Sequence, residues 1–340
     1  MKALKFLSLF LTMMALWSCS SNEEVITPEE ETPAKEYMAS IGFKGEISIS
    51  EAPLSRASGN DLYGIQVYSC GATDETNNYK AYAYGLFDDL TKMNIKLIEG
   101  YKYQFVATMV VDGKEKIWSS NDGEYACPFR GDVMDKNKIS NKFIYSQSQS
   151  LINLTNGINS GFSQMVSTDI NGFTSHNRPN LDRYYGEHTG YIPTENGNVA
   201  IDMKRTVFGL KVTVNNLTEG TLSIAMAEAP VMEITHPDTE IEDIFTFYYV
   251  SQAYATENYS ETVATTFNWV RTDGVTIPLG THDIAFKRNK QTIVTVEIDD
   301  ASVQNALSLS LETGTMGAGN TYTMEGETIT DTTVTPGSNE

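Results

Sequence analysis

The feature that most constrains the fold is an alternation of apolar and polar residues that starts at Tyr37 and recurs along the chain. Successive side chains of a strand point to opposite faces of a sheet, so a period of two predicts strands with one buried face. Turn pairs such as Asp112-Gly113 and Asp273-Gly274 separate the runs and are typical of hairpins. The clearest runs, rich in Thr, Val and aromatic residues, are 41–49, 101–109, 210–214 and 293–298. The chain is therefore predicted to be all-β, with a β-sandwich architecture.

The length predicts more than one folded domain, because 340 residues exceed an ordinary domain of about 100–200 residues. Residues 171–198 are rich in Asn, Gly and Tyr, and a fresh series of strands opens at Val199. We expect an N-terminal β-sandwich over 37–198 and a C-terminal β-sandwich over 199–325. The Thr-rich acidic residues 326–340 are expected to form a tail.

The N-terminus is typical of an export signal that ends at a cysteine. Two lysines precede the apolar run Phe6–Trp17, whose length of about 12 residues is too short for a spanning helix of about 20. Residues 1–18 are therefore predicted to be a signal peptide. The small residue before Cys19 resembles a bacterial lipobox, although Trp17 stands where a small or aliphatic residue is more usual. This implies a lipidated Cys19, since two or more acyl chains anchor a protein stably. An ordinary secreted protein is the alternative.

Residues 19–36 are expected to be a flexible acidic tether, because they are rich in Glu, Thr and Pro and lack an apolar period. The pair Glu23-Glu24 resembles the surface-export signal of Bacteroidetes lipoproteins. We therefore expect the chain to be exposed on the cell outer membrane and attached through Cys19.

The charge excludes some partners. The chain has 44 acidic and 24 basic residues, a formal net charge of −20. Nucleic-acid binding needs Lys and Arg against phosphates, so no nucleic-acid partner is expected. With so many carboxylates, adjacent acids indicate a solvated surface, and the hydrolase alternative needs two of them to converge in one cleft.

No catalytic motif is present, and neither an enzyme nor a cofactor is predicted. The chain lacks a Gly-x-Ser-x-Gly elbow and a His-Glu-x-x-His helix motif, and its 4 histidines fall in separate loops. No metal site is expected either. The weak calcium alternative rests on Asp112, Asp122, Asp299 and Asp300, which lack the usual loop spacing.

Cys70 and Cys127 form a candidate disulfide, because an exported chain can be oxidised. The bridge would close a loop of about 57 residues. Two separate thiols are the open alternative.

The aromatic residues leave a second function open, that of a monomeric glycan-binding lipoprotein of a polysaccharide-uptake system. Exposed rings can stack on sugars, and Trp118 and Trp269 are the first candidates. The tyrosines offer a similar platform, although Tyr also suits half-buried β surfaces.

Several stretches together resemble the fimbrillin superfamily of Bacteroidetes. They are the lipobox at Cys19 and the segments 42–50, 54–57, 62–68, 203–214 and 284–296. The resemblance implies two transthyretin-like β-sandwich domains in a pilus subunit or adhesin. It also implies other pilin subunits as partners, with the host or bacterial ligand left unidentified.

The resemblance further implies a mechanism of assembly. In polymerising members a protease cuts after an arginine in the loop that follows the first strand, and here Arg56 matches it, with Ala57 as the new N-terminus. Loss of that strand exposes unpaired backbone groups, which a strand from a neighbouring subunit fills. An uncut lipoprotein, in which Arg56 is an ordinary loop residue, is the alternative.

Overall fold

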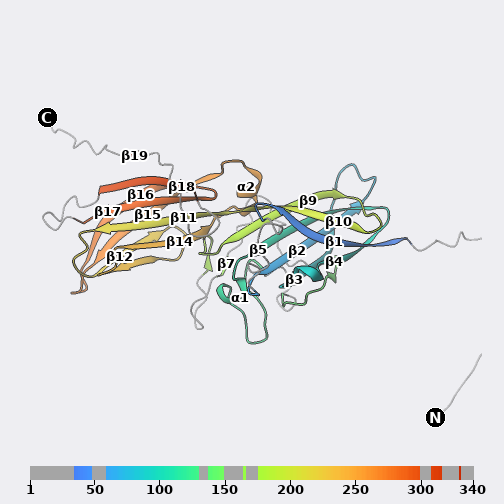
Figure 1. Cartoon of the computed structure of the whole chain (residues 1–340), viewed down its shortest axis with the longest axis horizontal. Coiled ribbons are helices and arrows are strands. Elements are labelled where there is room, and N and C mark those ends of the chain that lie inside the picture. The colour runs from blue at the N-terminus through green and yellow to red at the C-terminus, as the bar shows by residue number, and fades with distance from the viewer. Residues whose placement is uncertain are drawn as a thin grey trace, which may run out of the picture. The chain divides into compact units, whose positions relative to one another are not determined.

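A computed structural model describes residues 34–47, 59–129, 137–148, 164–165, 175–298, 308–315 and 329–330. Cys19, Arg56 and Ala57 lie outside these ranges, and so does the signal peptide. Strands dominate the described residues, which confirms the all-β class (Figure 1). All the elements belong to one compact unit, Lys35–Glu340, and the division into two domains stays a prediction.

The first half of this unit is built on one eight-stranded sheet with the order β4-β1-β10-β9-β5-β2-β3-β6. Short helices, η1 (Leu90–Lys92) and α1 (Gly113–Lys116), lie in its connections, and β7 (Gln164–Met165) pairs separately with β8 (Ser175–His176). The strands of the large sheet are β1 (Glu36–Gly45), β2 (Leu62–Gly71), β3 (Lys80–Phe87), β4 (Asn94–Ile98), β5 (Tyr101–Val110), β6 (Ile144–Tyr145), β9 (Arg183–Tyr191) and β10 (Gly197–Arg205).

The second half is a β-sandwich of two sheets, with the orders β14-β11-β17-β18-β19 and β13-β12-β15-β16. Phe208 and Val294 of one sheet pack in the same core as Ile224 and Phe267 of the other. Two sheets that share one core in this way form a sandwich. The elements are β11 (Val207–Asn215), β12 (Thr221–Met226), β13 (Met232–Thr235), β14 (Glu240–Thr246), α2 (Val250–Ala255), β15 (Ser260–Val270), β16 (Thr276–Lys287), β17 (Lys290–Glu297), β18 (Ser308–Thr315) and β19 (Ile329–Thr330).

The eight-stranded sheet curls around its own core. Ile95 of β4 and Phe87 of β3 lie near opposite ends of the strand order, yet both pack in one buried cluster with Phe105 of β5. A flat sheet would hold them far apart, so the sheet must bend until its two ends face each other.

Tyrosine hydroxyls, rather than a further strand, hold the outer edge of β4. Tyr82 donates a hydrogen bond to the Lys96 carbonyl (2.8 Å), and the Lys96 amide donates to the Tyr145 hydroxyl (2.9 Å). The Tyr103 hydroxyl accepts from the Ile98 amide (2.7 Å) and donates to the Ile98 carbonyl (3.2 Å). Phenol groups thus take the place of backbone partners where the ends of the sheet meet.

The change from the first sheet to the second falls later than the sequence suggests. A boundary between 198 and 199 would cut through β10, which pairs with β1 and β9. The sheets change instead at Thr206, whose amide and hydroxyl both donate to the Arg183 carbonyl (2.8 and 3.1 Å). One residue separates β10 from β11, so the apolar alternation continues without a turn signal. The change from one sheet to the other at Thr206 is therefore not visible in the sequence pattern.

Tyr82→Phe should lower the free energy of unfolding by about 1 kcal/mol, because it leaves the Lys96 carbonyl without its phenol donor. Tyr101→Phe is the matched control, since the Tyr101 side chain is 43% exposed, and should change stability by less than about 0.5 kcal/mol. Urea unfolding followed by fluorescence measures both. Equal effects of the two substitutions would contradict a role of the hydroxyl in holding β4.

Candidate functional site: the first strand and its exit

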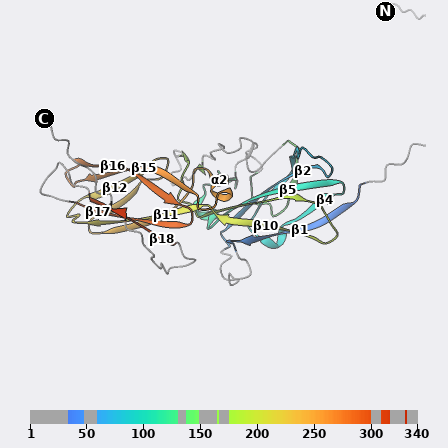
Figure 2. The ribbon, with the colours of Figure 1, turned by 90° about the horizontal axis from the view of Figure 1, so that it is seen from above.

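Strand β1 is an internal strand, paired along both of its edges (Figure 1). It runs parallel to β10, from the pair Ala39–Gly197 to the pair Gly45–Met203. On its other side it runs antiparallel to β4. Figure 2 shows β1 beside β10 from a second direction. We call the space that β1 fills between β4 and β10 the slot. Without β1, both edges of the slot would be open to pairing.

The side chains of β1 alternate between the core and solvent. Ala39, Ile41 and Phe43 are 1%, 6% and 8% exposed, whereas Met38 and Lys44 point outward. Phe43 stacks on Tyr63, with 5.8 Å between ring centroids. The inward side chains therefore become larger along the strand. They run from alanine near its N-terminal end, which we call the entry, to phenylalanine near its C-terminal end, which we call the exit.

Gly45 ends the strand where no other residue fits easily. Its φ is +88°, a left-handed conformation that side chains rarely adopt. A Cβ atom at this position would lie 2.2 Å from Asp202 Oδ1 and 2.7 Å from the Met203 carbonyl oxygen. The close approach of β10 thus demands glycine independently of φ.

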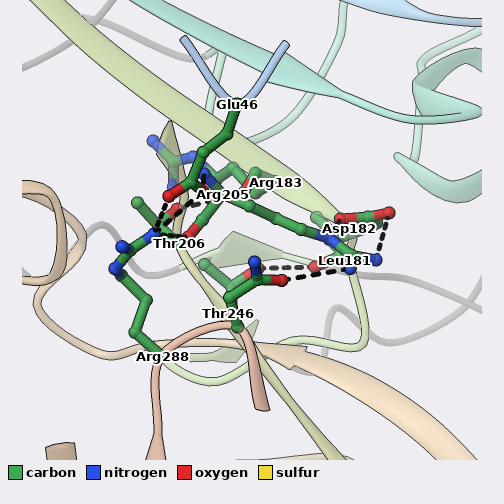
Figure 3. Close-up of polar contacts among 9 residues, drawn as sticks. Glu46, Leu181, Asp182, Arg183, Arg205, Thr206, Thr246 and Arg288 are labelled. Carbon is green, nitrogen blue, oxygen red and sulfur yellow. Dashed lines mark hydrogen bonds and ion pairs between the residues drawn. The ribbon is translucent and has the colours of Figure 1, made fainter. Parts of the chain in front are cut away.

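Glu46 joins the exit of β1 to both halves of the unit (Figure 3). Its amide donates to the Met203 carbonyl (2.9 Å), and its Oε2 accepts from the Arg205 amide (2.7 Å). Both carboxylate oxygens accept from Arg288 Nη1 (2.8 and 2.9 Å). Arg288 lies in the turn between β16 and β17, so one carboxylate connects β1, the end of β10 and the C-terminal sandwich.

A second ion pair lies beside this contact. Arg205 Nε and Nη2 donate to the two oxygens of Asp182 (2.7 and 2.8 Å), and these side chains are only 13% and 16% exposed. Burial alone would lower the pKa of Arg205, but the two-pronged contact with Asp182 raises that pKa above its ordinary value. The neighbouring Arg183 is fully buried, which lowers its pKa to about 10, and its Nε donates to Thr108 Oγ1 (2.8 Å). Arg183 and Arg205 are therefore both charged at neutral pH.

Cys70 and Cys127 are not joined by a disulfide. Cys70 lies near the end of β2, whereas Cys127 lies close enough to Arg183 to interact electrostatically. Arg183 pairs with Val110, and Val110 pairs with Leu62 at the opposite end of β2. Eight residues of strand, about 26 Å, therefore separate Cys70 from the end of β2 that pairs toward Arg183.

The two tryptophans predicted as candidates for glycan stacking pack in or against hydrophobic cores instead. Trp269 is 5% exposed, and its Nε1 donates to the Glu219 carbonyl (2.8 Å). Trp118 is half-buried and packs against the core cluster around Phe129. These two side chains do not offer a flat exposed pair.

Clusters of metal-ligating side chains and long apolar helices are both absent from the ranges that the structure covers. Within them, no group of three or more His, Cys, Asp or Glu residues is placed to hold a metal ion. Among the helices in the same ranges, none combines the length and apolar character needed to cross a membrane.

Sequence reasoning did not single out the residues that define the exit of β1, namely Gly45, Glu46, Arg205 and Arg288. The available signal was a glycine followed by a charged residue at the end of an alternating run. All four lie in the stretches 42–50, 203–214 and 284–296, which carry the resemblance to the fimbrillin superfamily.

No protein-family model matches the chain, and no curated protein sequence matches it. Solved structures do resemble it. The fimbrial anchor protein Mfa2 from Porphyromonas gingivalis shares 8% identity at a TM-score of 0.39, over 82% of this chain and 97% of that chain. A candidate polysaccharide-binding protein from Bacteroides thetaiotaomicron VPI-5482 shares 9% identity at a TM-score of 0.40, over 81% and 95%.

A candidate cell adhesion protein from Bacteroides uniformis shares 13% identity at a TM-score of 0.31, over 84% of this chain and 99% of that chain. Fimbrial and adhesion proteins of Bacteroidetes are therefore among the structural neighbours.

Gly45→Ala should destabilise the chain by about 3 kcal/mol, because it adds a collision with β10 to the cost of a positive φ. Gly100→Ala is the matched control. Its φ is +83° and a Cβ there meets nothing within 4 Å, so only the conformational cost of about 1 kcal/mol remains. Urea unfolding gives both values, and equal losses would show that β10 does not restrict this position.

Proposed function

We propose that this chain is a cell-surface fimbrillin-like lipoprotein, a pilus subunit or adhesin, that assembles by strand exchange after cleavage at Arg56. The observation that carries the proposal is the place of β1. It is an internal strand of the first sheet, and it lies in sequence between the expected lipid anchor at Cys19 and the candidate cleavage position. One cut would separate residues 19–56 from residues 57–340.

The physical logic follows from what β1 covers. Its removal would open the hydrogen-bonding edges of β4 and β10 and expose the apolar surface that Ala39, Ile41 and Phe43 now fill. A slot of this kind is unstable while empty. An extended segment of another subunit that supplies backbone partners and alternating apolar side chains would restore both, which is β-augmentation.

An arginine-specific protease should convert the purified precursor into one main product that begins at Ala57. Arg56→Gln should abolish that product, whereas Arg130→Gln, another arginine outside the described ranges, should not. Intact-mass measurement and N-terminal sequencing identify the cut, and electrophoresis without boiling detects heat-stable oligomers. If Arg56 is never cut, or the product beginning at Ala57 never oligomerises, assembly by strand exchange is wrong.

The anchor has its own test. Cys19→Ser should prevent incorporation of labelled fatty acid and release the chain from the membrane fraction, because the acyl chains supply the attachment. Cys70→Ser is the control and should leave the lipid label in place. A label that persists in the Cys19 variant would exclude lipidation at this residue.

A further inference from the structure

We propose that the slot selects its occupant by one acidic side chain at the exit, the position that Glu46 now holds. The partner is then an extended segment with alternating apolar side chains that ends in glycine followed by glutamate. This inference rests on the proposed function, in which the slot is emptied and refilled.

The charged positions of the segment differ in what they contact. Near its entry, Glu36 pairs with Lys96, but these side chains are 54% and 49% exposed. At the exit, Glu46 is 33% exposed and its partner Arg288 only 13%. An exposed pair contributes little to affinity, whereas a largely desolvated pair with hydrogen bonds contributes more. The exit is therefore where charge distinguishes one occupant from another.

Arg288 depends on the carboxylate that the strand brings. Its Nη1 donates to both Glu46 oxygens and to the Arg205 carbonyl (3.0 Å). Its Nε is buried and has no hydrogen-bond partner among the described residues. Without Glu46, the Arg205 carbonyl would be the one acceptor left to this guanidinium in the described part of the chain, and the Arg205 amide would lose its acceptor as well. An occupant with a neutral residue at this position leaves the cation uncompensated, which is costly.

The charges around the exit also favour an acid. Figure 3 shows Arg183, Arg205 and Arg288 gathered near two carboxylates, those of Asp182 and Glu46. Asp182 is engaged by Arg205. After departure of Glu46 with β1, Asp182 would remain engaged by Arg205 and Asp202 would remain on β10, but Arg288 would have lost its carboxylate partner. The unpaired Arg288 guanidinium therefore attracts an acidic side chain to the exit.

The acid and the glycine together set the register of the occupant. A slip of one residue turns the inward side chains outward and moves the glutamate to the other face of the sheet. The glycine position is equally strict, because a Cβ at Gly45 would meet Asp202 and the Met203 carbonyl. A Gly-Glu pair thus marks where a strand parallel to β10 must stop.

Synthetic peptides with the sequence of residues 35–47 test the inference against the full chain cut after Arg56. Binding of a fluorescent peptide is followed by anisotropy after the native strand is displaced. The Glu46→Gln and Glu46→Ala peptides should bind about tenfold or more weakly than the parent, because they leave Arg288 unpaired. The Glu36→Gln peptide is the matched control and should change affinity by less than about threefold.

A substitution of Arg288 in the cut chain completes a double-mutant cycle with the peptide variants. Arg288→Gln in the cut chain should bind the parent peptide and the Glu46→Gln peptide with similar affinity, because the coupling between the two positions is gone. Tight binding of all peptides regardless of the side chain at position 46 would overturn the selection rule and leave strand exchange standing. A cut chain that binds none of the peptides would overturn the proposed function and this inference with it.

The uncut chain provides a second measurement that needs no refilled slot. Glu46→Gln should speed hydrogen exchange of the Ile41 amide, which donates to the Met93 carbonyl (2.8 Å), about tenfold or more, since the exit no longer holds β1 closed. Glu36→Gln should leave that rate within about threefold of the original. Equal rates in the two variants would show that Glu46 does not secure the strand.

Discussion

Strand β1 supplies the backbone pairing that joins β4 to the rest of the eight-stranded sheet in the part of the chain that the structure describes. The other edge of β4 is held by phenol groups, not by a strand. Three inward side chains of β1 fill the core between these edges. The curled sheet therefore depends on β1, the N-terminal strand, because β1 connects β4 to the remaining strands and fills the core between them.

The exit of the same strand also governs the junction with the second half. Glu46 receives hydrogen bonds from Arg205 and Arg288, and Asp182 compensates the Arg205 guanidinium. Buried cations of this kind require carboxylates with good geometry, because desolvation otherwise outweighs attraction. Packing of β1 and electrostatic balance at the junction are therefore two aspects of one contact. This is why a strand at the start of the chain bears on a turn near its end.

Sequence periodicity predicts the strands well, because one buried face imposes the period of two on runs such as β5, β11 and β17. It does not predict the change from the first sheet to the second at Thr206, since apolar and polar residues alternate in both β10 and β11 and one residue separates these strands. The Cys70–Cys127 bridge fails for a related reason: exposure to an oxidising compartment says nothing about which end of β2 each thiol is near. Glu46 and Arg288 are 242 residues apart, and in a chain with 44 acids and 24 bases no local pattern marks that pair.

The phenol groups along β4 have a consequence for where new pairing can begin. An edge strand with free amides and carbonyls recruits other chains and starts aggregation. At Lys96 and Ile98 the outward backbone groups are already occupied by tyrosine hydroxyls. A stray strand thus finds no vacant partners at these residues, while the inner edge of β4 is covered for as long as β1 is in place. Both edges of β4 are therefore closed to new pairing at these residues while β1 stays in place.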